Sequence, residues 1–167
     1  MIRHRIYARH SGVGADERLD IPLIKRCLRE ALRLEGVDLP CEVSLLITDD
    51  EGIRDINREF RGFDKPTDVL SFPMQVFSPP GWDPHCVDMT APGTDVVMLG
   101  DIILSAPRVI EQAHEFSQSR ERETAYLTVH SVLHLLGYDH VDGAEGKRHM
   151  REREKEIMQN AECRMQK

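Results

Sequence analysis

Residues 130–140 have the sequence HSVLHLLGYDH, and they contain the most informative spacing in the chain. His130 and His134 are four residues apart within a helical pattern, so they lie on one helix face about 6 Å apart along the axis. Gly137 can adopt the left-handed conformation that ends a helix, and the chain can then turn and bring His140 to the same point. The pattern predicts three imidazoles that converge at a helix end.

Three convergent imidazoles predict a catalytic zinc site with one ion and an open fourth position. The same spacing of histidines and glycine occurs in metzincin proteases as H-E-x-x-H-x-x-G-x-x-H. Those proteases use the glutamate that follows the first histidine as general base. Here Ser131 occupies that position, and a hydroxyl cannot replace a carboxylate as the base at neutral pH. The site is therefore metzincin-like in its ligands and lacks the protease's base.

Around this segment, strand and helix patterns alternate along the chain. Four segments are predicted as strands, namely 2–8, 42–48, 67–72 and 96–104. Five are predicted as helices, namely 21–36, 50–60, 105–116, 120–136 and 143–160. Asp20, Asp49 and Ser105 are the expected N-caps, and Gly36 is an expected helix end. The pattern predicts an α+β (mixed α/β) fold with a small four-stranded mixed sheet covered by about five helices, in undetermined strand order.

Residues 75–95 form the longest stretch without a regular pattern. Proline and glycine recur throughout it, so we expect a mostly irregular loop, longer than loops usually are. His85 and Cys86 lie within it, but adjacent residues point in different directions and no matching pair follows. A second metal site is therefore not expected there.

Length and composition favour one soluble domain that spans residues 1–167. The chain is 40% hydrophobic and 31% charged, as in ordinary globular proteins. No apolar run approaches the length of a membrane span, and charged residues occupy the start, where a signal peptide would be hydrophobic. We therefore expect a cytoplasmic protein whose isolated cysteines are free thiols. These are Cys27, Cys41, Cys86 and Cys163.

Three segments together resemble the YbeY family, the bacterial endoribonucleases that act as ribosomal RNA maturation factors. The first is HSVLHLLGYDH at 130–140, which is similar to the family signature H-[GS]-x-L-H-L-x-G-Y-D-H. The second is Asn57 and Arg61 followed by DKPTDVLSFP at 64–73. The third is LGDIILS at 99–105. They occur in family order, and the similarity extends from about residue 40 to 160.

The resemblance implies a zinc-dependent, single-strand-specific endoribonuclease that matures the 3′ end of small-subunit (16S) rRNA and acts in ribosome quality control. It implies one zinc ion held by His130, His134 and His140, with Arg61 as a further catalytic residue. RNA is the implied partner, together with the ribosome or small-subunit proteins. Arginine suits this role because its guanidinium binds phosphate bidentately and stabilises developing negative charge. At a helix C-terminus it also interacts favourably with the helix dipole.

Further polar residues of these segments have two interpretations. Asp139, Asp68 and Asp101 either orient a ligand from the second coordination shell or cap and close loops. Tyr138 is expected to pack rather than to stack on a base.

The net charge of −7 opposes the RNA interpretation, since nucleic-acid binders usually present a basic surface. A local cluster of cations would resolve the conflict, and six basic residues are candidates. These are Arg3, Arg5, Arg9, Arg58, Arg61 and Lys65.

Two alternatives stay open from the sequence. One is a zinc peptidase or amidohydrolase on the same scaffold, with a carboxylate base from another part of the chain. The other is a non-catalytic ribosome-associated factor with a structural metal. The nucleophile, which is water or the RNA's own 2′-hydroxyl, the general base, the metal used in the cell and the oligomeric state are likewise undetermined.

Overall fold

The computed structural model describes residues 1–139 and 143–165 and shows a four-stranded sheet with the order β1-β2-β4-β3. Strands β1, β2 and β4 run parallel, and β3 pairs antiparallel with β4. The strands are β1 (Arg5–His10), β2 (Cys41–Thr48), β3 (Val69–Pro73) and β4 (Val97–Ser105). Strands β1 and β3 are thus the two edges of the sheet.

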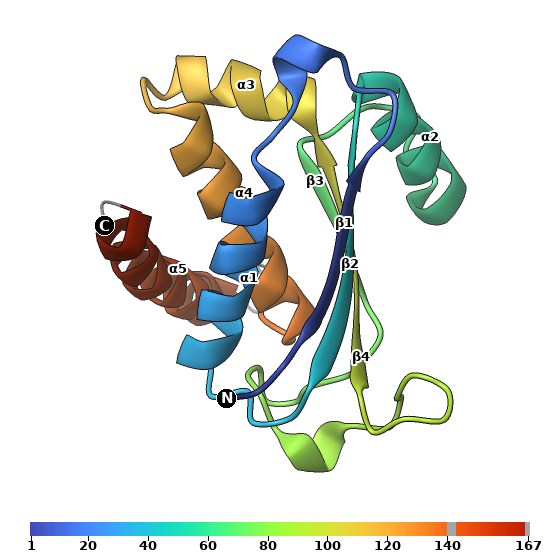
Figure 1. The fold of residues 1–167 in the computed structure, drawn as a ribbon, viewed down its shortest axis with the longest axis vertical. Helices are drawn as coiled ribbons and strands as arrows, with labels where there is room; N and C mark the ends of the chain where they lie inside the picture. Colours follow the sequence, from blue (N-terminus) through green and yellow to red (C-terminus); the bar gives the residue numbers. More distant parts are fainter. Residues whose placement is uncertain (140–142, 166–167) are drawn as a thin grey trace.

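Five α-helices of the described chain pack around this sheet (Figure 1). They are α1 (Ile21–Leu34), α2 (Asp50–Arg61), α3 (Ala106–Glu115), α4 (Arg120–Leu135) and α5 (Gly143–Met165). Helices α1, α4 and α5 lie on one side of the sheet and α2 lies on the other (Figure 1). The predicted fold class, a mixed four-stranded sheet covered by about five helices, is confirmed.

Helix α4 is the central helix of the layer, since it contacts α1, α3, α5 and the sheet. Its side chains are buried on most sides, and Leu133 and Leu135 are fully enclosed. A helix that is buried on most of its sides forms part of the core. The two histidines of this helix, His130 and His134, therefore extend from an element that is packed on most sides.

The predicted helix ends are confirmed at atomic detail. The side chain of Asp20 accepts a hydrogen bond from Leu23 N at 3.0 Å, and Asp49 accepts one from Gly52 N at 2.8 Å. These bonds satisfy backbone N–H groups that have no partner in the first helical turn. Gly36 follows α1 with φ +74°, a conformation that glycine adopts without steric cost.

The segment 75–95 is mostly irregular, as expected, with one short 3-10 turn (η2, Pro84–Cys86). Gln75 is buried and holds the loop to the sheet. Its amide donates to Met89 O and Met98 O, both at 2.7 Å. Phe77 belongs to the main core and lies next to Gly137, just after α4, so one end of the loop is fixed there.

The described chain has no helix that is both long and apolar enough to cross a membrane. Its described cysteine side chains, Cys27, Cys41 and Cys86, are free thiols, as predicted. Burial raises the pKa of Cys27 to about 11 and that of Cys41 to about 12. These two thiols therefore stay protonated at neutral pH and act as small core residues.

Gly100 marks the point where β4 departs from a regular strand. Its φ is +143°, and the pairing of β2 with β4 shifts register at this point, between Glu42 and Val43. A Cβ atom at this position would lie 2.2 Å from Phe72 O. Only glycine therefore allows β3 and β4 to pair here.

We expect Gly100→Ala to lower the free energy of unfolding by about 2–4 kcal/mol, because it adds both backbone strain and a clash with a backbone oxygen. Urea denaturation monitored by circular dichroism measures the change. Gly14→Ala is the matched control, since Gly14 has φ −66° and a Cβ atom added there would meet no other atom within 4 Å. Equal stability of the two variants would contradict this explanation of the glycine.

Candidate metal centre

His130 and His134 converge at the C-terminal end of α4. Their Nε2 atoms lie 3.0 Å apart, and the two ring centroids are 4.5 Å apart at an interplanar angle of 79°. Both side chains are partly buried. The helical spacing predicted from the sequence thus directs both Nε2 atoms to one point.

A carboxylate on α5 fixes the orientation of the first imidazole. Glu154 is buried, with 4% of its surface exposed, and its Oε1 lies 2.5 Å from His130 Nδ1. A carboxylate accepts the proton on Nδ1, which leaves the Nε2 lone pair directed at the convergence point. Glu154 therefore selects the tautomer of His130 that can bind a metal ion.

Tyr126 completes this arrangement one turn earlier on α4. Its hydroxyl donates to Glu154 Oε2 at 3.1 Å, and its ring stacks on that of His130 with centroids 6.0 Å apart. Burial raises the pKa of the Tyr126 hydroxyl to about 12, and the nearby Glu154 carboxylate contributes to the shift. The hydroxyl thus stays protonated and saturates the second oxygen of the carboxylate.

The geometry fits a tetrahedral zinc ion. With Zn–N bonds of about 2.0–2.1 Å, two nitrogens of a tetrahedral site lie about 3.3 Å apart, close to the 3.0 Å between the two Nε2 atoms. His140, the predicted third ligand, lies outside the described residues. Within the described chain no group of three or more His, Cys, Asp or Glu side chains is placed to hold a metal ion.

Ser131 has a structural role. Its side chain is fully buried, and its hydroxyl donates to Leu127 O at 2.8 Å within α4. The position that carries the general base in metzincins therefore faces the core and not the convergence point. A peptidase mechanism with its base at this position is incompatible with the structure.

The two histidines lie in a cleft of about 720 Å³ between α4, β3 and the start of the irregular loop. Asp139 and Arg61 also line it. The remaining lining residues are Asp68, Val69, Ser71, Pro73, Gln75, Val76, Phe77, Gly137 and Tyr138. The long loop thus supplies one wall of the cleft.

Arg61, the cation predicted from the sequence, lies in this cleft at the end of α2. Its Nη2 donates to Ser71 O at 3.1 Å, and its guanidinium lies 5.5 Å from the centre of the Phe72 ring. Neither contact neutralises the charge. Arg61 is therefore held in place while its positive charge stays available to an anion in the cleft.

Gly137 lets the chain turn sharply after α4. Its φ is +92°, and a Cβ atom there would lie 2.7 Å from Phe77 O, so the predicted left-handed glycine is confirmed. Tyr138, the next residue, is buried and its hydroxyl donates to Glu35 Oε2 at 2.8 Å. This agrees with the expected packing role of Tyr138.

The same Glu35 anchors α5. Its side chain is 3% exposed and forms an ion pair of 2.6 Å with Arg153, which also donates to Leu34 O at 3.2 Å. Arg153 directly precedes Glu154, so α1, the end of α4 and α5 are held together next to the two histidines. This anchoring fixes the position from which Glu154 contacts His130.

Two of the aspartates considered from the sequence have other roles. Asp101 lies on β4, where it lines a different hollow with Tyr7 and Phe60, and burial together with Glu42 raises its pKa. Asp68 closes a loop, since it accepts hydrogen bonds from Val69 N at 2.7 Å and Gln112 Nε2 at 3.1 Å. Of the three aspartates considered from the sequence, Asp68 and Asp139 line the cleft and Asp101 does not.

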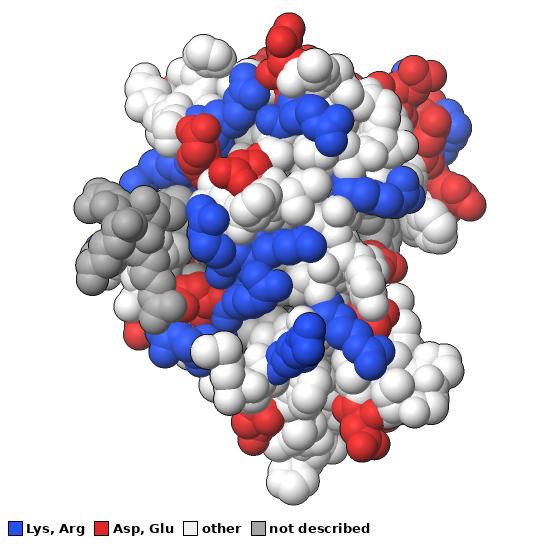
Figure 2. Space-filling view, in the orientation of Figure 1, with Lys and Arg blue, Asp and Glu red and all other residues white. Residues whose placement is uncertain are grey.

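Most of the six basic residues proposed from the sequence do not lie in the cleft of His130 and His134. Arg3, Arg5 and Arg9 lie in or next to β1, the sheet edge opposite β3, and Figure 2 shows Lys and Arg side chains gathered over α1 and β1. Arg58 pairs with Asp55 at 3.0 Å and Asp64 at 3.5 Å, and Lys65 lies over the Phe63 ring. Arg61 is the one candidate of the six that lines the cleft.

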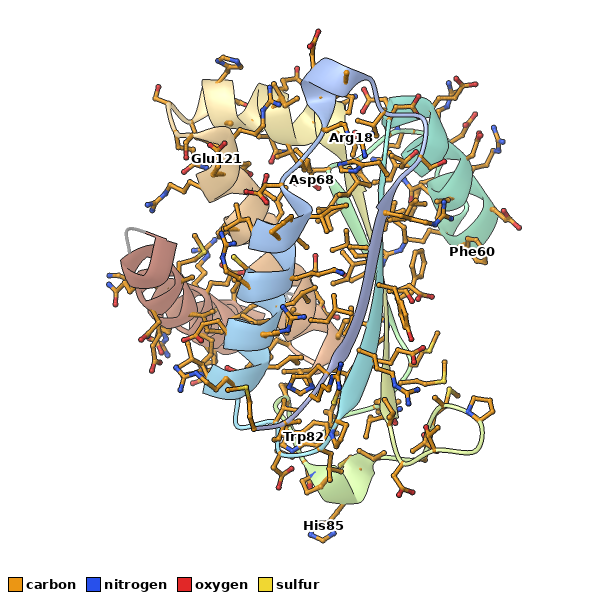
Figure 3. All side chains as sticks on the ribbon, in the orientation of Figure 1. Arg18, Phe60, Asp68, Trp82, His85 and Glu121 are labelled. Carbon is orange, nitrogen blue, oxygen red and sulfur yellow. The ribbon has the colours of Figure 1, made fainter. Side chains whose placement is uncertain are left out.

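His85 lies on η2 at the lower end of the molecule and points outward (Figure 3), and it does not line the cleft of His130 and His134.

Comparison with known proteins identifies the family to which this chain is related. The family model described as "Endoribonuclease YbeY" matches residues 8–162. The chain belongs to the YbeY family. A Clostridium botulinum protein named endoribonuclease YbeY is 47% identical over 141 residues, which cover 81% of this chain and 84% of that protein. One from Clostridium beijerinckii is 44% identical over 156 residues, with coverage of 90% and 92%.

A solved structure supports the same assignment. The solution structure of TM1509 from Thermotoga maritima superimposes with a TM-score of 0.61 and 26% sequence identity. The match covers 96% of this chain and 91% of the TM1509 chain. The family suggested by the three sequence segments is therefore confirmed, and the fold extends over nearly the whole of this YbeY-family chain.

Sequence reasoning missed Glu154 and Tyr126. Helix α5 is rich in glutamate, and Glu152 and Glu156 flank Glu154 at exposed positions, so nothing in the local pattern marks one carboxylate. The helical period could have indicated that Glu154 is buried. Ile157 and Met158, at i+3 and i+4 from Glu154, are apolar and buried, so Glu154 lies on the same helix face. A carboxylate in an apolar stripe needs a partner, and His130 provides it.

We expect Arg153→Ala to destabilise the protein by about 3 kcal/mol, because it leaves the buried Glu35 carboxylate without its cation. Thermal and urea unfolding measure the loss. Arg148→Ala, which removes an exposed cation from the same helix, should change stability by less than about 0.5 kcal/mol. If both variants unfold alike, the ion pair does not anchor α5.

Proposed function

We propose that this YbeY-family protein is a zinc-dependent, single-strand-specific endoribonuclease. The observation that supports it best is the shared cleft of Arg61, His130 and His134, which is lined by a guanidinium and by two convergent imidazoles. Curated relatives named endoribonuclease YbeY, at 44–47% identity, support cleavage of RNA.

In this proposal His130, His134 and His140 hold one zinc ion. When bound, zinc would polarise a phosphoryl oxygen and lower the pKa of a water molecule towards neutrality. Glu154 keeps the proton of His130 on Nδ1, and Tyr126 holds Glu154 by its second oxygen. Arg61 binds a non-bridging oxygen of the scissile phosphate and stabilises the charge that develops in the transition state.

We further propose the cellular role implied by the sequence resemblance. The protein would act in the cytoplasm on precursor small-subunit rRNA, at its 3′ end, together with ribosomal components. Its chemistry leaves two nucleophiles open, and the products distinguish them. A 2′,3′-cyclic phosphate on the cleaved RNA would identify the 2′-hydroxyl as the attacking group.

Purified protein is expected to cleave a single-stranded RNA, to lose this activity on chelation and to regain it with zinc. His134→Ala should abolish cleavage, whereas Arg61→Ala should keep bound zinc and lower kcat by about 100-fold. Gel analysis of end-labelled RNA and a zinc assay on each sample provide the two readouts. Equal cleavage by wild type and His134→Ala would show a contaminating nuclease. A zinc-loaded wild type that cuts no RNA would favour the non-catalytic ribosome-associated factor.

Glu154→Gln tests how the histidine is held. The amide keeps the size of the side chain but loses the charge that holds the proton on Nδ1, so zinc affinity should fall by about 10- to 100-fold. Competition with a chromophoric chelator measures the zinc Kd. Glu152→Gln, exposed on the same helix, is the control and should bind zinc as the wild type does. Identical zinc affinity of the two variants would exclude an orienting role for Glu154.

A further inference from the structure

A second hollow, of about 730 Å³, lies next to the metal cleft between α3, α4 and α5. We call it the α5 groove. Asp68 lines both hollows, and Tyr126, on the groove wall, stacks on His130 in the cleft. In Figure 3 Asp68 lies in the upper half of the molecule, the end that carries α3 and the start of α4. The groove therefore extends the cleft towards the other end of α4.

The charged side chains of this groove that are fully exposed are positive. Arg122 extends from the first turn of α4, and Arg151 and Lys155 extend from successive turns of α5. All three are exposed. Arg151 and Lys155 form no ion pair with another described residue, so their charges are not already neutralised.

Three carboxylates line the same groove, and all of them are hydrogen-bonded. Asp68 is partly exposed and accepts from Gln112 Nε2 at 3.1 Å. Glu154 is 4% exposed and bonded to His130, and Glu123 is 2% exposed and bonded to Gln118. Burial raises the pKa of Glu123, which reduces its tendency to carry charge. The fully exposed charges of the groove are thus basic, although the chain as a whole is acidic.

Two exposed aromatic side chains accompany these cations. Phe116, at the end of α3, is 62% exposed, and Tyr126 is 36% exposed. Cations combined with aromatic faces are the arrangement that binds single-stranded nucleic acid, because phosphates pair with the cations and unpaired bases stack on the rings. A duplex would offer no free base faces. The volume suits about one or two nucleotides.

We propose that the α5 groove is a binding subsite for single-stranded RNA, in which Arg151 and Lys155 contact phosphates next to the scissile one and Phe116 stacks on a base. The inference rests on the proposed function. It adds the path that the RNA strand follows on the surface after it leaves the cleft. It also accounts for RNA binding by a protein of net charge −7, because affinity depends on the local field along the strand.

The test measures RNA binding separately from cleavage. Fluorescence anisotropy with a labelled oligouridylate gives the Kd, and a His134→Ala background keeps the RNA intact. Arg151→Ala/Lys155→Ala should raise the Kd about tenfold and reduce the slope of log Kd against log salt by about 1.4, since each single-strand phosphate contact contributes about 0.7. Phe116→Ala should weaken binding about fivefold or more and leave the salt slope unchanged.

Lys25→Ala/Arg29→Ala is the matched control. It removes one lysine and one arginine at the same helical spacing from α1, and it should leave the Kd within about twofold. Circular dichroism confirms that each variant is folded. If the α1 pair weakens binding while the groove pair does not, or if both weaken it equally, the proposal is overturned.

Cleavage of the same RNA by the wild-type protein separates this inference from the proposed function. If the RNA is cut and the groove variants bind as the parent does, the groove proposal fails alone. If the RNA is not cut but binding still depends on Arg151, Lys155 and Phe116, the nuclease proposal fails and the groove remains a single-strand binding site.

Discussion

Burial of the Glu154 carboxylate between α4 and α5 is the constraint on which the site depends. A buried charge is costly unless hydrogen bonds compensate it. Here His130 and Tyr126 saturate both oxygens. The same contacts set the tautomer and the ring orientation of His130, so the requirement to satisfy a buried carboxylate also prepares a ligand for a metal ion.

The surrounding fold maintains this contact. Glu35, at the end of α1, binds both Arg153 of α5 and Tyr138, which follows the end of α4. Three segments that are distant in sequence are thereby fastened beside the histidines. The central position of α4, packed against the sheet and three other helices, limits movement of the imidazoles. Preorganisation of this kind is what electrostatic catalysis requires.

The sequence predicted the local features well because short-range physics determines them. The N-caps at Asp20 and Asp49, the glycine ends at Gly36 and Gly137, and the convergence of His130 with His134 follow from spacing alone. Fold class followed from the alternation of strands and helices. Strand order did not, since it depends on how residues far apart in the chain pair, and the position of β3 at the edge is a tertiary result.

The same limit explains what was missed at the site. Glu154 is 24 residues from His130, and its role depends on the docking angle of α5, which no local pattern encodes. The proposed answer to the conflict between an acidic chain and an RNA substrate is also tertiary. Of the six cations chosen from the sequence only Arg61 lines the cleft, whereas the packing of α5 places Arg151 and Lys155 in the α5 groove.

Zinc K-edge X-ray absorption of the purified protein tests the metal centre most directly, because it reports the ligand atoms and their distances without reference to activity. We predict one zinc ion per chain, with three imidazole nitrogens at about 2.0–2.1 Å and a further light scatterer in the open position. A sulfur shell at about 2.3 Å, or a fully loaded protein with fewer than three imidazoles around its zinc, would contradict this metal centre.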